Sequence, residues 1–207
     1  MDVHAPDEPV HTWRDFAIHL LVVTIGLLIA LSLEALVEHL HQRHLLHTAE
    51  ANLHIELQNN RNLLAGDERQ LNHTESELQK DIAILSARKS NPGVTEPLNF
   101  DWTWNSVEAS AWTTARDSGA LTLMPYDTEQ AWSVIYGQQG AVNERASVYI
   151  ADIYRAQAPT KGRTFAQLTP AEVDQSIVGL QQALADVDLL RDYCKSLDRI
   201  YQRSGNL

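Results

Sequence analysis

The longest apolar run in the chain covers residues 16–33, and its only ionisable side chain is His19. A helix rises about 1.5 Å per residue, so roughly twenty apolar residues cross the hydrocarbon core of a bilayer. The run therefore predicts a transmembrane helix over residues 13–38, preceded by a short polar tail at residues 1–12.

Both ends of the run carry the side chains that membrane interfaces favour. Trp13 and Arg14 stand just before it, and Glu34 follows it. Aromatic and charged groups are enriched at the two lipid–water interfaces. We therefore interpret these three residues as the membrane boundaries.

A cleaved signal peptide is the alternative interpretation of the same run. Residues 30–32 (Ala-Leu-Ser) form a small-x-small cleavage sequence behind an apolar stretch. A signal peptide begins with net positive charge, however, and the residues ahead of this run include four acids and one arginine. These charges favour a retained anchor.

One narrow face of the predicted span gathers its unusual residues. Residues three or four apart share a face of a helix, and the positions within about 40° of His19 are Val23, Gly26, Ala30 and Leu33. Gly26 and Ala30 form a small-x-x-x-small pair, which lets a second helix approach closely in lipid. We expect this face to be a helix–helix interface.

An ionisable group inside a span is a functional hypothesis by default. His19 lies six residues beyond Trp13, roughly 9 Å along the helix. Three roles remain open from the sequence: a hydrogen bond to a neighbouring helix, a hydrated position near the headgroups, or axial ligation of a haem or chlorophyll-type macrocycle.

No strong helix breaker follows until Ser90-Asn-Pro-Gly93, so the span is expected to continue as a long helix over residues 39–90. Leucine recurs every seven residues from Leu57 to Leu85, which marks one buried seam. The companion heptad positions are polar and unsuited to a two-stranded coiled coil: Asn60, Asp67, Thr74 and Asp81. We therefore expect the helix to lie against its own domain.

Five histidines cluster just after the span, at positions 39, 41, 44, 47 and 54. Weak binding of a transition metal is one interpretation, but no cysteine accompanies them and the spacing fits no common site. Protonation below about pH 6.5, with attraction to anionic lipids, is another.

Residues 91–207 are expected to form a helical bundle that packs on the long helix. Helices are predicted over residues 102–118, 127–158 and 170–201, with a short extended link at 121–125 and a turn at 158–163. The strongest local signal is Leu168-Thr-Pro-Ala-Glu172, which has the pattern of a capping box with proline at the first helical position. The sequence thus predicts an all-α protein.

Composition excludes several kinds of function. The net charge is −11, which disfavours nucleic acid as a partner. No histidine follows residue 73, so the bundle lacks Ser-His-Asp and Cys-His catalysis. Cys194 falls on an apolar stripe and is expected to be buried. The aromatic residues are the one candidate pocket lining, although packing in the core is the favoured explanation for them: Trp102, Trp104, Trp112, Tyr126, Trp132 and Tyr136.

Two stretches resemble a family of uncharacterised bacterial single-span membrane proteins. The first consists of residues 13–16 (WRDF), 19–21 (HLL) and 26–34 (GLLIALSLE), and the second is W-x-x-A-x-x-S-G-A-L-x-x-M-P over residues 112–125. The resemblance implies a bacterial inner-membrane location and carries no catalytic residues.

The sequence therefore predicts a non-catalytic, single-pass accessory subunit that packs against a larger membrane complex, plausibly respiratory or photosynthetic. Its expected partners are other membrane subunits or a second copy, together with the lipid bilayer. A membrane-anchored sensor with a ligand among the tryptophans is the alternative, and cofactor ligation by His19 is a second one. The short tail favours a cytoplasmic N-terminus and a periplasmic bundle.

Overall fold

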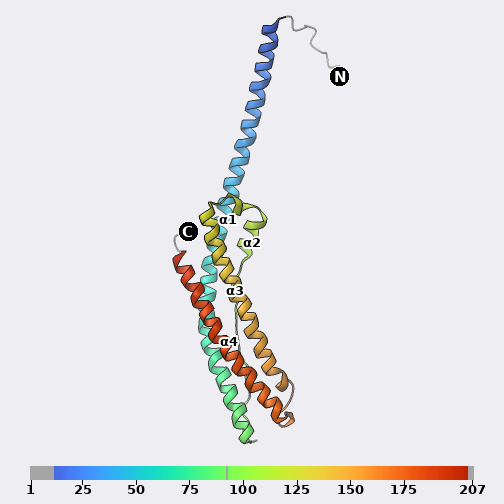
Figure 1. Cartoon of the computed structure of the whole chain (residues 1–207), viewed down its shortest axis with the longest axis vertical. Helices are drawn as coiled ribbons and strands as arrows, with labels where there is room; N and C mark the ends of the chain where they lie inside the picture. Colours follow the sequence, from blue (N-terminus) through green and yellow to red (C-terminus); the bar gives the residue numbers. More distant parts are fainter. Residues whose placement is uncertain (1–11, 92, 205–207) are drawn as a thin grey trace, which may run out of the picture. The chain divides into compact units, whose positions relative to one another are not determined.

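The computed structural model describes residues 12–91 and 93–204, and within them it contains helices and short 3-10 turns but no strand (Figure 1). The all-α prediction is therefore confirmed. The chain divides into two compact units, Met1–Thr48 and Ala49–Leu207. The predicted polar tail, residues 1–12, lies outside the described residues except for Thr12.

The first helix, α1, covers Trp13–Ser90 and takes part in both units. Its length follows from the absence of proline and from having only two isolated glycines, Gly26 and Gly66, which a long helix tolerates. It ends at Ser90, just before the Asn-Pro-Gly sequence. The predicted continuation of the apolar run into a long helix is therefore confirmed.

The second unit is built on three long helices that lie side by side: α1 from residue 49 onward, α3 (Tyr126–Gln157) and α4 (Pro170–Arg203) (Figure 1). Arg61 of α1 donates to the Tyr201 carbonyl of α4, and Glu75 of α1 pairs with Arg191 at 2.5 Å. Residue numbers therefore rise on α1 as they fall on α4. These two helices are antiparallel.

The predicted leucine seam forms the contribution of α1 to the core. Each leucine of the heptad row is at most 4% exposed: Leu57, Leu64, Leu71, Leu78 and Leu85. Large aromatic residues from the other two helices complete the core, including Trp132, Tyr149 and Tyr201. Burial of this apolar area is the main stabilising term of the bundle.

The predicted helix over residues 102–118 is wrong for its first half. Helix α2 covers only Ser110–Asp117, and residues 94–109 form an extended segment, which we call the strap. Five of its backbone N–H groups donate to side chains of α1 and α3 rather than to one another. Asp81 accepts from the N–H of Asn99 at 2.9 Å and from that of Phe100 at 2.6 Å. This side-chain competition for the backbone explains why the strap does not become helical.

The polar companions of the leucine seam hold the strap. Asn60 forms two hydrogen bonds with the backbone of Glu108, donating at 2.7 Å and accepting at 2.8 Å. Asp67 accepts from the backbone N–H of Asn105 at 3.0 Å. Seven helical residues advance about 10.5 Å and three extended residues about 10 Å, so a heptad on α1 matches every third residue of the strap. The polar heptad positions therefore bind the strap, which runs along α1, and not a second helix of a coiled coil.

The strap also fixes the direction of the helix that follows it. It returns along α1 from Asp81 to Asn60, so α3 begins beside the early turns of the bundle. His54 and Trp132 accordingly meet, with ring centroids 5.1 Å apart. Because of this return, α1 and α3 run parallel and α4 runs antiparallel to both.

Short elements connect the helices. Gly119 takes a left-handed conformation (φ 78°) after α2, and a 3-10 turn, η1 (Ala120–Leu123), occupies the predicted extended link. Two further 3-10 turns, η2 (Ala158–Thr160) and η3 (Phe165–Gln167), join α3 to α4. Thr169 caps α4 and forms the predicted capping box with Glu172.

Candidate functional site

The stripe predicted on the span consists of His19, Val23, Gly26, Ala30 and Leu33, and all five residues lie on α1. Regular helical geometry therefore puts them on one face. Their side chains are exposed, and a Cβ added to Gly26 would meet nothing within 4 Å. The first unit thus supplies no partner to this face within residues 12–48.

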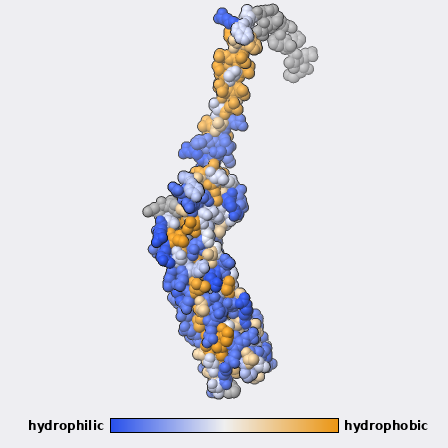
Figure 2. Space-filling model, in the orientation of Figure 1, coloured by the Kyte–Doolittle hydropathy of each residue, from blue (hydrophilic) through white to orange (hydrophobic). Residues whose placement is uncertain are grey.

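The face of the run that Figure 2 shows is mainly apolar. This part of α1 is long and apolar enough to span a membrane. Trp13 is 80% exposed and its ring lies tilted against that of Phe16, with centroids 5.5 Å apart. Arg14 and Glu34, the other predicted boundary residues, are exposed as well.

The polar side chains in the run differ in whether they have a hydrogen-bond partner. The Thr24 hydroxyl donates to the Leu20 carbonyl and the Ser32 hydroxyl donates to the Leu28 carbonyl, both at 2.7 Å. Such bonds to the preceding turn remove the cost of placing hydroxyls in lipid. The His19 imidazole forms no hydrogen bond or ion pair with any residue that the structure describes. It therefore differs from the two hydroxyl groups of the run, which bond to their own helix.

The juxtamembrane histidines do not converge. His39, His41, His44 and His47 are all exposed on α1, and His54 lies against the edge of Trp132. Within residues 12–91 and 93–204, no three His, Cys, Asp or Glu side chains come together as a metal site.

The aromatic residues separate into two groups instead of lining one pocket. Trp112 stacks on Tyr136 with centroids 5.2 Å apart, and Trp132 lies beside Tyr136 at 6.2 Å. Trp102 instead meets Tyr154 of α3, at 5.8 Å. Tyr126 is 73% exposed. The prediction of a shared tryptophan pocket does not fit this arrangement.

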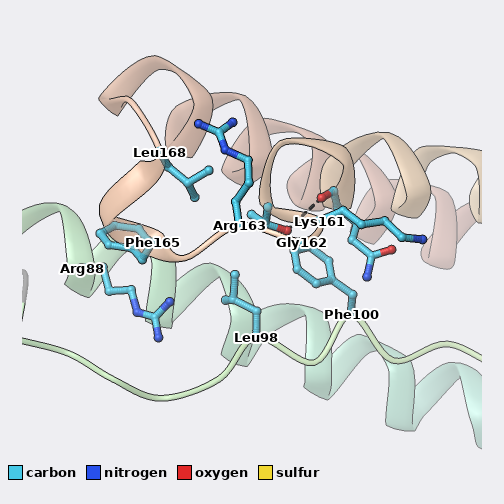
Figure 3. Close-up of a pocket in the computed structure, with 10 residues that line it drawn as sticks. Arg88, Leu98, Phe100, Lys161, Gly162, Arg163, Phe165 and Leu168 are labelled. Atoms are coloured by element: carbon cyan, nitrogen blue, oxygen red, sulfur yellow. Dashed lines mark hydrogen bonds between the residues drawn. The ribbon is translucent and has the colours of Figure 1, made fainter.

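A different hollow, of about 290 Å³, lies where α1 and α3 end (Figure 3). It is bounded by the last turn of α1, the strap, the end of α3 with η2, and η3. Its lining residues are Arg88, Leu98, Phe100, Gln157, Thr160, Lys161, Gly162, Arg163, Phe165 and Leu168. We call it the end pocket.

Sequence reasoning missed the end pocket for a topological reason. Arg88 falls in the last turn of a predicted helix, and Lys161 and Arg163 fall in a predicted turn about seventy residues away. Three basic residues next to helix ends are a weak signal by themselves. Only the antiparallel packing of α4 against both parallel helices brings the two loops together.

Cys194 is fully buried, as its place on the apolar stripe predicts. Burial, followed by the nearby carboxylates of Glu68 and Asp67, raises the pKa of its thiol to about 12. A thiol with such a pKa is protonated at neutral pH and is a poor nucleophile.

No family model, no curated protein and no solved structure matches this chain. The resemblance of its opening stretch to bacterial single-span proteins therefore stays a prediction. What the fold defines is a class: a helical protein with one candidate membrane-spanning segment and a bundle crossed by an extended strap.

Proposed function

We propose that the protein is a non-catalytic, single-pass accessory subunit that packs through its span against another membrane protein. The observation that carries this proposal is the contrast between His19 and the two hydroxyl residues of the run. Thr24 and Ser32 bond to their own helix, while His19 is left without a partner among the described residues. In lipid, such a group is stabilised by a neighbouring helix.

Small residues beside His19 support the same docking face. Gly26 and Ala30 project little from the helix, so a partner backbone can approach closely at that level. The partner would offer an acceptor or donor to the imidazole and a similarly smooth face. A subunit of a respiratory or photosynthetic complex fits this description, and so does a second copy of the chain.

The location that fits the proposal is a bacterial inner membrane. The N-terminus would lie in the cytoplasm and the bundle in the periplasm, because a short tail usually stays inside. Arg14 before the span and Arg43 after it give little charge asymmetry. Labelling of single cysteines introduced at Thr12 and Ser204 by a membrane-impermeant reagent in intact cells distinguishes the two orientations.

A non-catalytic role is supported by the surroundings of the reactive groups in the second unit. His54 packs on Trp132, and His73 pairs with Asp101 at 3.0 Å on an exposed surface. Cys194 is buried with a raised pKa. None of these three side chains lines the end pocket.

The proposal is tested by enlarging one alanine on the stripe and one on the opposite face. Ala30→Leu fills the predicted contact, while Ala17→Leu makes the same change on the far side of the same helix. After mild detergent extraction, the wild type and Ala17→Leu should migrate as a complex larger than one protomer. Ala30→Leu should shift toward the protomer mass, and a wild-type protein that is already a lone protomer would contradict the proposal.

Cofactor ligation is a second candidate, favoured by the same unpartnered imidazole. Open space around Gly26 would admit a flat macrocycle on the face that carries His19. The purified membrane protein should then show a visible absorption band that His19→Ala abolishes. A colourless wild-type preparation that still forms the complex would leave packing as the role of His19.

A sensor role is favoured by the end pocket and not by the tryptophans. The hollow at the end of the bundle is a candidate ligand site, whereas the aromatic residues pack in separate pairs. A membrane-anchored sensor would couple occupancy of this pocket to the helices that form it. Thermal unfolding with and without ligand would show the coupling as a shift in Tm.

A further inference from the structure

The end pocket differs in charge from the rest of the protein. The chain carries 16 basic and 27 acidic residues, yet the pocket lining contains three basic residues and no acidic one. In a protein of net charge −11, a concave surface of this composition concentrates positive potential. It is the part of the second unit that would attract a small anion.

Two of the three basic side chains are not neutralised by an ion pair and can therefore attract an anionic ligand. Arg163 pairs with Glu172 at 2.6 Å, and its guanidinium points away from Leu98 and Phe100 (Figure 3). Arg88 instead donates to the carbonyls of Val94, at 3.1 Å, and Glu96. Neither Arg88 nor Lys161 forms an ion pair with a described residue. Neutral carbonyls orient the Arg88 fork without cancelling its charge.

Apolar side chains form the other walls of the pocket. Phe165 lies under the Arg88 guanidinium, with 5.1 Å between the guanidinium carbon and the ring centroid. Phe100, from the strap, lies at the opposite end of the pocket from Phe165, with Leu98 between the two rings (Figure 3). A ligand here would meet two aromatic rings as well as the cations.

The backbone at Phe100 is held in an unfavourable conformation. Its φ is 46°, and it is the only non-glycine residue with a positive φ in the part of the chain that the structure describes. Asp81 keeps it there by accepting its N–H at 2.6 Å. Strain of this kind persists where the surroundings fix a side chain in place, and it concentrates at binding sites. Here it fixes the ring that forms one wall of the pocket.

We propose that the end pocket binds a small aromatic carboxylate. A planar guanidinium matches a carboxylate in a forked pair, and Lys161 at the exposed rim adds a second charge. The rings of Phe100 and Phe165 suit an aromatic body. The volume of about 290 Å³ is at the small end of ligand pockets, which favours a single-ring acid. The proposal concerns the second unit alone and does not depend on docking of the span.

The test measures binding of benzoate and phenylacetate to the full-length protein in detergent by isothermal titration calorimetry. Benzyl alcohol serves as the neutral counterpart of benzoate, and inorganic phosphate as an anion without a ring. We expect the two acids to bind at millimolar concentration or below, at least tenfold more tightly than benzyl alcohol or phosphate. Equal binding of benzyl alcohol, or of phosphate, would overturn the proposal.

Three charge-removing variants assign the binding to this pocket. Lys161→Gln should weaken benzoate binding several-fold, and Arg88→Gln should weaken it tenfold or more. Lys89→Gln is the matched control, because Lys89 is adjacent in sequence, pairs with Asp174 and does not line the pocket. Unchanged affinity in Lys161→Gln and in a folded Arg88→Gln would overturn the proposal.

Arg88→Gln could misfold, because the Arg88 guanidinium also holds the strap. A variant that fills the pocket and leaves Arg88 in place provides an independent test. Leu98→Trp adds a large ring to a partly exposed wall and keeps every cation. It should abolish benzoate binding while the circular dichroism spectrum stays that of the wild type. Retained affinity in Leu98→Trp would contradict the location assigned to the site.

Discussion

At the scale of single residues, two buried aspartates of α1 perform similar tasks with different geometry. Asp81 uses both carboxylate oxygens, accepting from Asn99 through Oδ1 and from Phe100 through Oδ2. Asp67 uses only Oδ1, which accepts from the backbone and the side-chain amide of Asn105, while Oδ2 is buried without a partner. The same substitution should therefore be more destabilising at Asp81 than at Asp67.

Asp81→Asn should destabilise the protein by about 1–3 kcal/mol, because one backbone N–H of the strap loses its acceptor. Asp67→Asn keeps both hydrogen bonds at Oδ1 and removes a buried charge, so we expect a change within about 1 kcal/mol in either direction. Urea unfolding of both variants in detergent, followed by tryptophan fluorescence, measures the difference. Equal destabilisation by the two substitutions would contradict the hydrogen-bond assignment.

Asp67 also makes stability depend on pH. Burial raises its pKa above the ordinary value of 3.8, and the hydrogen bonds from Asn105 only partly oppose the shift. The folded state therefore holds the proton more tightly than the unfolded state. Its contribution to stability is greatest below pH 3.8 and is lost as pH rises through the raised pKa.

Asp67→Asn should remove this contribution. The difference in unfolding free energy between wild type and variant should change as pH rises from about 4 to 7, with the wild type losing stability relative to the variant. Urea titrations at several pH values measure the difference. A difference that stays constant over this range would show that Asp67 does not titrate there.

At the scale of elements, the extended conformation of the strap depends on side-chain amides of α1 and α3 more than on the strap's own sequence. Asn60 binds both the N–H and the carbonyl of Glu108, and Asn143 of α3 does the same for Val107 at 3.1 and 2.8 Å. Asn60→Ala should cost about 2 kcal/mol, because buried backbone groups lose their partners. Asn59→Ala, at an exposed neighbouring position, should change stability by less than about 0.5 kcal/mol.

Hydrogen exchange adds a local measurement to this comparison. The amide of Glu108 should exchange much faster in Asn60→Ala than in the wild type, while amides in the middle of α4 keep their protection. Uniformly faster exchange over the whole bundle would indicate global destabilisation rather than release of the strap.

The close packing of α3 and α4 is tested by two glycines. A Cβ at Gly179 of α4 would come within 2.8 Å of the Ala156 Cβ and 3.0 Å of its Cα, whereas a Cβ at Gly137 of α3 would meet nothing within 4 Å. Gly179→Ala should therefore destabilise by about 1–3 kcal/mol through overpacking. Gly137→Ala should stabilise by roughly 0.5–1 kcal/mol through helix propensity. Thermal unfolding of the two variants gives the signs, and two changes of the same sign would contradict the helix spacing.

Much of the fold could be predicted at the element scale. The apolar run, the heptad leucines and the Thr169 capping box act through neighbours in the chain, and the structure confirms each of them. The strap could not be predicted in the same way. Residues 102–109 have no local reason to be extended, because their partners on α1 lie 38 to 48 residues earlier. The polar row at Asn60, Asp67 and Asp81 was visible, but nothing local identified its partner.

The same difference between local and long-range interactions explains which candidate sites the sequence could predict. The stripe at His19 follows from helical periodicity alone, so the sequence was enough to define it. The end pocket forms only where the segment after α1 and the segment between α3 and α4 come together. Local sequence patterns do not show that these two segments meet. The aromatic residues do not line one pocket, because Trp102 contacts Tyr154 while Trp112 stacks on Tyr136.

At the scale of the whole molecule, the chain contains two units with different demands on their surroundings. The bundle buries its apolar seam internally, from Leu57 to Leu85. The run at residues 16–33 buries none of its apolar side chains within the described protein. Such a surface is long and apolar enough to span a membrane, and we propose that its stripe contacts a partner. The central claim of our account is that one face of this span is a protein contact and the opposite face meets lipid.

A photo-crosslinking scan of the span in native membranes tests this claim most directly. A photoreactive amino acid is placed at each position from Ala17 to Leu33 in turn, and its adducts are separated into protein and lipid. We predict protein adducts at His19, Val23, Gly26 and Ala30, with lipid adducts at Leu21 and Leu28 on the opposite face. Lipid adducts at every position, or protein adducts without helical periodicity, would contradict the account.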